Sequence, residues 1–180
     1  MNLNLEVSIG DIVSAVSLTL AIIGGIFAYY QWKKNTLLKR AEYINELTEK
    51  IRTDKDISET VYILDYGKPW YSREFHGSGE NERKMDKTLS YFSYICYLKK
   101  QKIITKKEFT FFKYEAIRIL QSLQIQDYFY NLYHFANKFG TPLTFKYLFE
   151  YGKENKMFED AFYSKDSHLS SEKYHYNLNY

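Results

Sequence analysis

The stretch IVSAVSLTLAIIGGIFAYY, residues 12–30, decides the fold of this chain. Its nineteen positions hold no charged residue and no proline. At about 1.5 Å per residue, a helix of this length measures about 30 Å, the thickness of the hydrocarbon core of a bilayer. A helix satisfies its own backbone hydrogen bonds, as lipid requires. The stretch therefore predicts one transmembrane helix over residues 12–31.

The charges that flank this stretch predict its orientation. Glu6 and Asp11 precede it without any lysine or arginine, whereas four basic residues follow it: Lys33, Lys34, Lys39 and Arg40. Because positive charge stays on the cytoplasmic side, residues 1–11 are expected outside and the chain after Trp32 inside. A cleaved signal peptide would instead need a basic start and a small-residue cleavage site. The sequence predicts a single-pass protein of the bacterial inner (cell) membrane with a cytoplasmic C-terminal domain.

One face of the predicted span carries small residues. On a helical wheel they occupy an arc of about 100°: Ser14, Ser17, Ala21, Gly24, Gly25 and Ala28. Small residues let two helix backbones approach closely in lipid, so this face predicts transmembrane association and a homo-oligomer. The alternative interpretation is that such residues are common in any membrane helix.

Composition favours a single helical domain after the span. The chain has 180 residues, of which only two are proline and eight are glycine, which suits long helices better than many turns. Residues 1–40 hold four basic and two acidic side chains, which leaves 21 basic and 20 acidic side chains in the rest. This balance argues against a nucleic-acid partner. The single cysteine, Cys96, excludes an internal disulfide.

Apolar spacing divides the rest of the chain into a stalk, a bundle and a tail. A helical stalk is predicted over residues 32–53, where Leu37, Ala41, Ile44, Leu47 and Ile51 recur every three or four positions. The stalk could form a short parallel coiled coil or pack on its own domain. A cytosolic all-α domain of about five helices is predicted over 54–152, with helices near 54–66, 83–102, 105–123, 127–139 and 142–149. Residues 153–180 are predicted to be a weakly structured tail.

Start signals, stop signals and buried faces support these helices. Thr105-Lys-Lys-Glu108 is a capping box, Gly140 is a helix stop, and Thr141-Pro142 predicts an N-cap followed by the first residue of the last helix. The residues expected to face the core are Met85, Leu89, Phe92, Cys96, Phe109, Phe112, Ala116, Ile119, Leu120, Leu123, Phe129, Leu132, Tyr133, Ala136, Phe145, Leu148 and Phe149. Cys96 is thus expected to be a buried apolar side chain rather than a reactive thiol.

Two groups of residues are candidates for a partner or ligand surface. The first lies in a loop over residues 68–82 that is rich in glycine and polar residues but also contains Trp70, Tyr71, Phe75 and His76. These side chains could fasten the loop to the helices or form a binding loop. The second group surrounds a turn between two helices: Lys99, Lys100, Lys102, Lys106 and Lys107. It could be a solvated turn, or a patch for a nucleotide or for anionic lipid.

No motif for catalysis, metal binding or cofactor binding is found. Gly77-Ser-Gly79 lacks the lysine and hydroxyl residue of a P-loop, and the four histidines form no pair at i,i+4 and no cluster with cysteine. Asp127, Asn131, His134 and Lys138 share a helix face, which is expected to be solvated. No catalytic, cofactor-binding or metal-binding residue is predicted, although an enzymatic role stays open.

Residues 86–149 resemble a group of small bacterial membrane proteins of uncharacterised function. The resemblance rests on a helix with Asp86, Leu89, Phe92 and Ile95, on the turn KIITKKE at 102–108, and on Thr141-Pro142 followed by Phe145. It implies one amino-terminal membrane helix and a cytosolic all-helical domain. Some proteins of this layout look like membrane effectors of anti-phage defence, whose assembly permeabilises the membrane.

These observations predict a non-enzymatic, membrane-anchored protein that binds a signal or partner and self-associates through its span. Its expected partners are the lipid bilayer, further copies of itself, and a protein or a nucleotide signal. The alternative function is an oligomeric pore-forming or membrane-disrupting effector of an anti-phage defence system.

Overall fold

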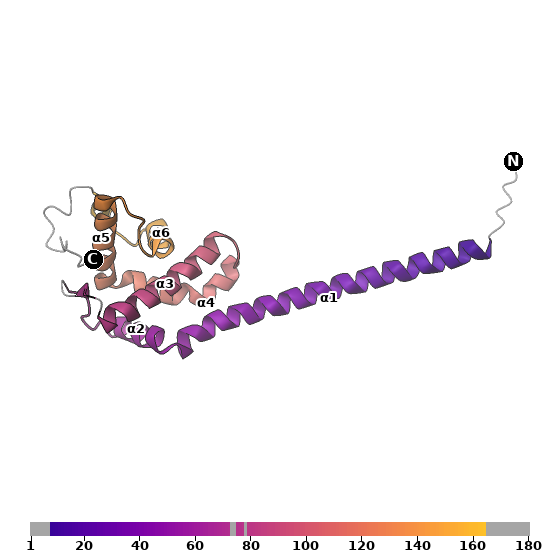
Figure 1. The fold of residues 1–180 in the computed structure, drawn as a ribbon, viewed down its shortest axis with the longest axis horizontal. Coiled ribbons are helices and arrows are strands. Elements are labelled where there is room, and N and C mark those ends of the chain that lie inside the picture. Colours follow the sequence, from indigo (N-terminus) through magenta and orange to yellow (C-terminus); the bar gives the residue numbers. More distant parts are fainter. Residues whose placement is uncertain (1–7, 73–74, 78, 165–180) are drawn as a thin grey trace. The chain divides into compact units, whose positions relative to one another are not determined.

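The computed structural model describes residues 8–72, 75–77 and 79–164 (Figure 1). They form six α-helices and a final 3-10 turn: α1 (Ile9–Thr53), α2 (Lys55–Asp65), α3 (Glu80–Lys100), α4 (Lys106–Gln121), α5 (Leu123–Phe139), α6 (Lys146–Glu154) and η2 (Asp160–Tyr163). No strand occurs in this described part of the chain. The all-α prediction is therefore confirmed, with five helices after α1. The chain divides into two compact units, residues 1–46 and 47–180.

Helix α1 begins with a reciprocal cap and continues without a break far beyond the apolar stretch. The backbone N–H of Ser8 donates to Asp11 Oδ2 (2.9 Å), and the N–H of Asp11 donates to Ser8 Oγ (3.2 Å). By length and composition the helix could cross a membrane, and no part of the described chain buries its most apolar window. It is the one candidate span among the described residues.

The predicted stalk is the last part of this same helix, and its residues differ in burial. Leu37, in the first unit, is 60% exposed. Leu47, at the start of the second unit, is buried, and its carbonyl oxygen accepts a hydrogen bond from the hydroxyl of Tyr91.

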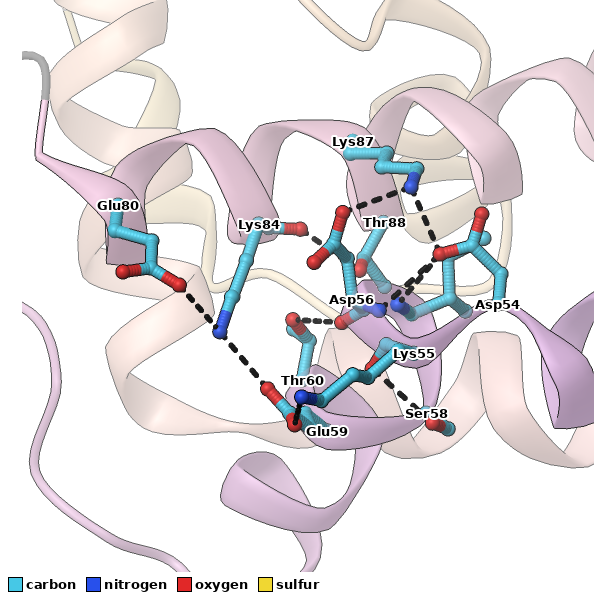
Figure 2. Close-up of polar contacts among 11 residues, drawn as sticks. Asp54, Lys55, Asp56, Ser58, Glu59, Thr60, Glu80, Lys84, Lys87 and Thr88 are labelled. Carbon is cyan, nitrogen blue, oxygen red and sulfur yellow. Dashed lines mark hydrogen bonds and ion pairs between the residues drawn. The ribbon is translucent and has the colours of Figure 1, made fainter.

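Charged side chains fasten α2 to α3 (Figure 2). Asp54 caps α2 by accepting hydrogen bonds from the backbone N–H groups of Asp56 and Ile57. Lys87 of α3 donates to Asp54 Oδ1 and to Asp56 Oδ2, each over 2.8 Å. One turn away, Lys84 bridges Glu59 (2.8 Å) and Glu80 (2.9 Å). The bond between Lys84 and Glu59 thus repeats the link between the two helices.

The face of α3 opposite these lysines lies in the core, as predicted. Met85, Leu89, Phe92 and Cys96 are all buried. Burial raises the pKa of the Cys96 thiol to about 12, so the sulfur stays protonated and is no nucleophile at neutral pH. The helix begins at Glu80 rather than near residue 83.

Helix α4 has one confirmed signal at its start and one wrong prediction at its end. The capping box is present: Thr105 Oγ1 accepts from the Glu108 N–H (3.2 Å), and Glu108 Oε2 accepts from the Thr105 N–H (2.6 Å). The predicted stripe of α4 is buried from Phe109 to Leu120, but Leu123 is 73% exposed. Ser122 is extended (φ −64°, ψ 121°), so the helical periodicity stops before Leu123, and α5 begins there rather than near residue 127.

The entry to α6 differs from the prediction. Gly140 ends α5 in the left-handed conformation (φ 66°), as predicted. Thr141-Pro142, however, does not begin the next helix, which starts at Lys146 after a left-handed Phe145 (φ 55°). The Phe145 ring is buried, 6.3 Å from the ring of Phe129, so packing of this ring in the core coincides with a later helix start.

The packed domain extends beyond residue 152, where the bundle was predicted to end. Phe158 and Phe162 are buried, and the ring of Phe158 stacks on that of Phe149 with centroids 5.2 Å apart. A Cβ atom on Gly152 would lie 2.7 Å from the Phe158 ring, so this glycine makes room for the aromatic side chain. Residues 165–180 of the predicted tail lie outside the described residues.

The face of α5 that was expected to be solvated is partly core. Asn131 and His134 are buried, whereas Lys138 is exposed. His134 Nε2 lies 3.1 Å from the carbonyl oxygen of Phe162, and Asn131 donates to the carbonyl oxygen of Asp127 (2.8 Å). The prediction is wrong because η2 packs over this face, which the spacing within α5 does not reveal.

Candidate functional site

A cavity of about 420 Å³ lies where the end of α2 meets α4 and the start of α5. This volume falls within the usual range of small-molecule sites, about 300–1,000 Å³. We call it the α2–α4 pocket, and its lining residues are Val61, Leu64, Asp65, Gly67, Glu115, Arg118, Ile119, Gln121, Ser122, Leu123 and Gln124. None of the residues predicted from the sequence as a partner surface is among them.

An ion pair crosses the pocket from α4 to α2. Asp65 is the last residue of α2, and Arg118 lies in the last turn of α4, where a cation is also favoured by the helix dipole. Their side chains form a close salt bridge. The guanidinium carbon of Arg118 also lies 5.1 Å from the centre of the Tyr114 ring, one turn earlier on α4. The Arg118 side chain therefore contacts two partners, Asp65 and Tyr114.

Glu115 is the lining residue that has a hydrogen-bond acceptor without a donor among the described residues. Its Oε2 atom is buried and makes no hydrogen bond with any described residue. Burial raises the pKa of this carboxyl group, the charge of Arg118 opposes that rise, and Asp65 adds to it. A buried acceptor without a donor is costly, so a donor from a bound molecule would be stabilising here.

Gln124 joins the pocket to the aromatic loop, by which we mean residues 68–72 and 75–77. Its Oε1 atom accepts hydrogen bonds from the backbone N–H groups of Trp70 (2.6 Å) and Tyr71 (2.9 Å). Its Nε2 atom donates to the carbonyl oxygen of Lys68 (3.2 Å). One side chain of the pocket wall thus makes hydrogen bonds with three backbone groups of the loop.

The predicted loop residues pack around one ring of α5. Phe75 and His76 are buried, Trp70 and Tyr71 are half-buried, and all four rings have centroids within 5.9 Å of the Tyr128 ring centroid. The interpretation that these side chains fasten the loop to the helices agrees with this packing. A role of the same four residues in binding a partner stays a prediction.

Two residues of the aromatic loop and one residue of α3 place a hydroxyl, an imidazole and a carboxylate next to one another. Tyr71 Oη lies 3.1 Å from His76 Nε2, and His76 Nδ1 lies 3.5 Å from Glu82 Oε1. This order resembles that of a nucleophile, a base and an orienting acid. His76, however, is completely buried, so the arrangement gives a substrate no access to the imidazole. Among the described residues, no group of three His, Cys, Asp or Glu side chains could hold a metal ion.

Two of the five lysines near the α3–α4 turn have partners within the domain. The Nζ atom of Lys99 lies over the rings of Phe109 (4.6 Å) and Tyr151 (4.1 Å), and its burial lowers its pKa. Lys100 is bonded to Glu150 Oε2 over 2.6 Å. The other three are exposed: Lys102, Lys106 and Lys107. A role for them in binding anions stays a prediction.

The small residues of α1 lie on an open helix surface. Cβ atoms added at Gly24 or Gly25 would meet no atom within 4 Å. There is thus room for another helix or for lipid at both glycines, and association through this face stays a prediction.

Sequence reasoning missed Glu115, Arg118 and Gln124. Glu115 and Arg118 are spaced i,i+3 beside the apolar stripe of α4, a pattern that ordinary surface ion pairs also show. When the chain is compared with models of protein families, with curated proteins and with solved structures, nothing matches.

Proposed function

We propose that this protein is a membrane-anchored binding protein, in which α1 holds the helical domain at a bacterial inner membrane and the domain receives a ligand. The N-terminus lies outside and the domain lies in the cytoplasm. The role is non-enzymatic, and further copies of the chain associate through the small-residue face of α1.

The uncovered apolar surface of α1 is the observation that carries this proposal. Val16, Leu20, Ile23 and Phe27 are each more than half exposed, and no described part of the chain covers them. In water, exposed apolar area is unfavourable by about 25 cal/mol per Å². Lipid offers this surface an apolar surrounding, and the basic residues that follow favour the stated orientation.

The α2–α4 pocket supports the binding role of the domain. It combines apolar walls with a few polar groups, the usual make-up of a small-molecule site. Arg118 forms a salt bridge with Asp65, and one buried oxygen of Glu115 has no hydrogen-bond donor among the described residues. These features suit recognition of a ligand more than a chemical step, because histidine, cysteine and lysine are absent from the described residues that line the pocket.

Two fusions after Tyr180 test the anchoring and its direction. A fluorescent protein fused there should fold and emit, because the C-terminus lies in the cytoplasm. Alkaline phosphatase fused at the same position should be inactive, because this enzyme needs the periplasm. An active phosphatase together with a dark fluorescent fusion would overturn the proposed orientation.

An oligomeric pore or membrane-disrupting effector is the second candidate function. The observation that favours it is the open space at Gly24 and Gly25, where a neighbouring helix could approach. Gly24→Leu should weaken self-association in a membrane two-hybrid assay, whereas Leu20→Ile on the other face should not. If expression depolarises cells and Gly24→Leu abolishes the effect, the pore is favoured. Association without depolarisation favours the binding protein.

A further inference from the structure

We propose that the α2–α4 pocket binds a small organic ammonium ion, whose nitrogen donates to Glu115 and whose apolar body lies against the aliphatic lining. This inference rests on the proposed function, since it names the class of ligand that the domain receives. It follows from the charges, the buried oxygen and the walls of the pocket.

The charges that line the pocket favour a cation. Among the described residues, the ionisable ones that line the pocket are Asp65, Glu115 and Arg118, and their charges sum to minus one when all three are ionised. The Arg118 guanidinium forms its salt bridge with Asp65. The charge of Arg118 acts on both carboxyl groups, so the described lining keeps one negative charge in excess, which attracts a cation and repels an anion.

The buried oxygen of Glu115 fixes where the nitrogen binds. Glu115 belongs to the pocket lining, and its buried Oε2 atom has no hydrogen-bond donor among the described residues. A hydrogen bond between two ionised groups is about twice as strong as a neutral one. An ammonium group at Oε2 supplies both the missing donor and the compensating charge, and so keeps Glu115 ionised despite its burial.

The remaining walls select for an apolar body on that ammonium group. Val61, Leu64, Ile119 and Leu123 bring aliphatic side chains from three helices to the cavity. Burial of apolar ligand surface against them adds affinity that a bare ammonium ion cannot gain. The cavity of about 420 Å³ accommodates a compound of small-molecule size.

Three compounds with the same apolar body and different head groups test this inference. Calorimetric titration of the full-length protein in phosphatidylcholine nanodiscs uses 2-phenylethylamine (cation), 2-phenylethanol (neutral) and 3-phenylpropionate (anion), with empty nanodiscs as the blank. The amine should bind at least about tenfold more tightly than the other two, because only the amine adds a positive charge to its hydrogen bond with the Glu115 carboxylate.

Matched variants locate the binding. Glu115→Gln should weaken amine binding by at least about tenfold, whereas Glu159→Gln, which removes an exposed carboxylate outside the lining, should leave it unchanged. Leu123→Lys places a competing cation at an exposed lining position, which does not disturb the core, and should also weaken binding. Circular dichroism establishes that each variant is folded.

Equal binding of the three compounds, or unchanged amine binding by Glu115→Gln and Leu123→Lys, would overturn the inference. Absence of any binding would overturn it too, while the membrane anchoring and orientation of the proposed function would be unaffected, since the fusions test those separately.

Discussion

The side-chain oxygen Oε1 of Gln124 lies 2.6 Å from the backbone nitrogen of Trp70. Gln124 also lines the α2–α4 pocket, so this one hydrogen bond connects the pocket wall to the aromatic loop. The loop in turn packs on Tyr128, in the middle of α5. A molecule that enters the pocket therefore lies beside the residue that fixes the start of the loop.

Replacing Gln124 with alanine should loosen the aromatic loop. The change removes hydrogen bonds to Lys68, Trp70 and Tyr71, which together should lower the free energy of unfolding by about 1–3 kcal/mol. In a Trp32→Phe background, Trp70 is the only tryptophan, and acrylamide should quench its fluorescence more strongly in the variant.

Gln121→Ala is the matched control, since Gln121 is exposed in the same pocket lining and has no such bonds to the loop. It should leave the quenching of Trp70 unchanged. Equal quenching in both variants would show that Gln124 does not hold the loop.

Much of the fold could be predicted from the sequence because local rules decide it. The capping box at Thr105, the glycine stop at Gly140 and the buried face around Leu89 each depend on neighbours within a few residues. The prediction that a helix begins at Thr141-Pro142 is wrong, because a contact with a distant part of the chain accompanies the actual start. There, the ring of Phe145 packs against α5, and the helix starts only after that contact.

The pocket could not be predicted because residues far apart in the chain create it. Asp65 and Arg118 meet only after α2 packs on α4. In the sequence, Gln124 is one polar residue among polar and apolar neighbours. Its hydrogen bonds join it to residues more than fifty positions away. The burial of His134 likewise depends on η2, a short element with little sequence pattern of its own.

Leu120→Asp should unfold the domain. The Leu120 side chain is completely buried, so the change removes core packing and places a carboxylate in an apolar surrounding. The expected loss is about 4 kcal/mol or more in the free energy of unfolding. Leu123→Asp introduces the same chemistry three residues later, where the side chain is 73% exposed. Thermal melts followed by circular dichroism should show a much lower melting temperature for the first variant alone, and equal melts would contradict the assigned core.

The ion pairs of Lys87 should make stability depend on pH at the acid end. Hydrogen bonds from Lys87 lower the pKa of Asp54 and of Asp56. A carboxyl group whose pKa is lowered by folding stabilises the fold above its unfolded pKa of about 3.9, and this contribution is lost as the pH falls through the folded pKa. Stability should therefore decline below about pH 4.

Lys87→Met should flatten that decline, because the variant has no ion pairs with Asp54 and Asp56 to lose. Lys55→Met is the control, since Lys55 is largely exposed and its contact with Glu59 is a long one of 3.7 Å. Urea unfolding midpoints between pH 3 and pH 7 check this expectation. An acid decline of the same slope in wild type and Lys87→Met would show that other groups cause it.

Alkaline carbonate extraction of membranes from cells that express the full-length chain tests the central claim most directly. If α1 spans the bilayer, the protein stays in the membrane pellet. A double change, Ile22→Arg with Ile23→Arg, places two charges near the middle of the span, each unfavourable by about 2.5–3.5 kcal/mol, and should shift the protein to the soluble fraction. Release of the unaltered protein into the supernatant would contradict membrane anchoring by α1.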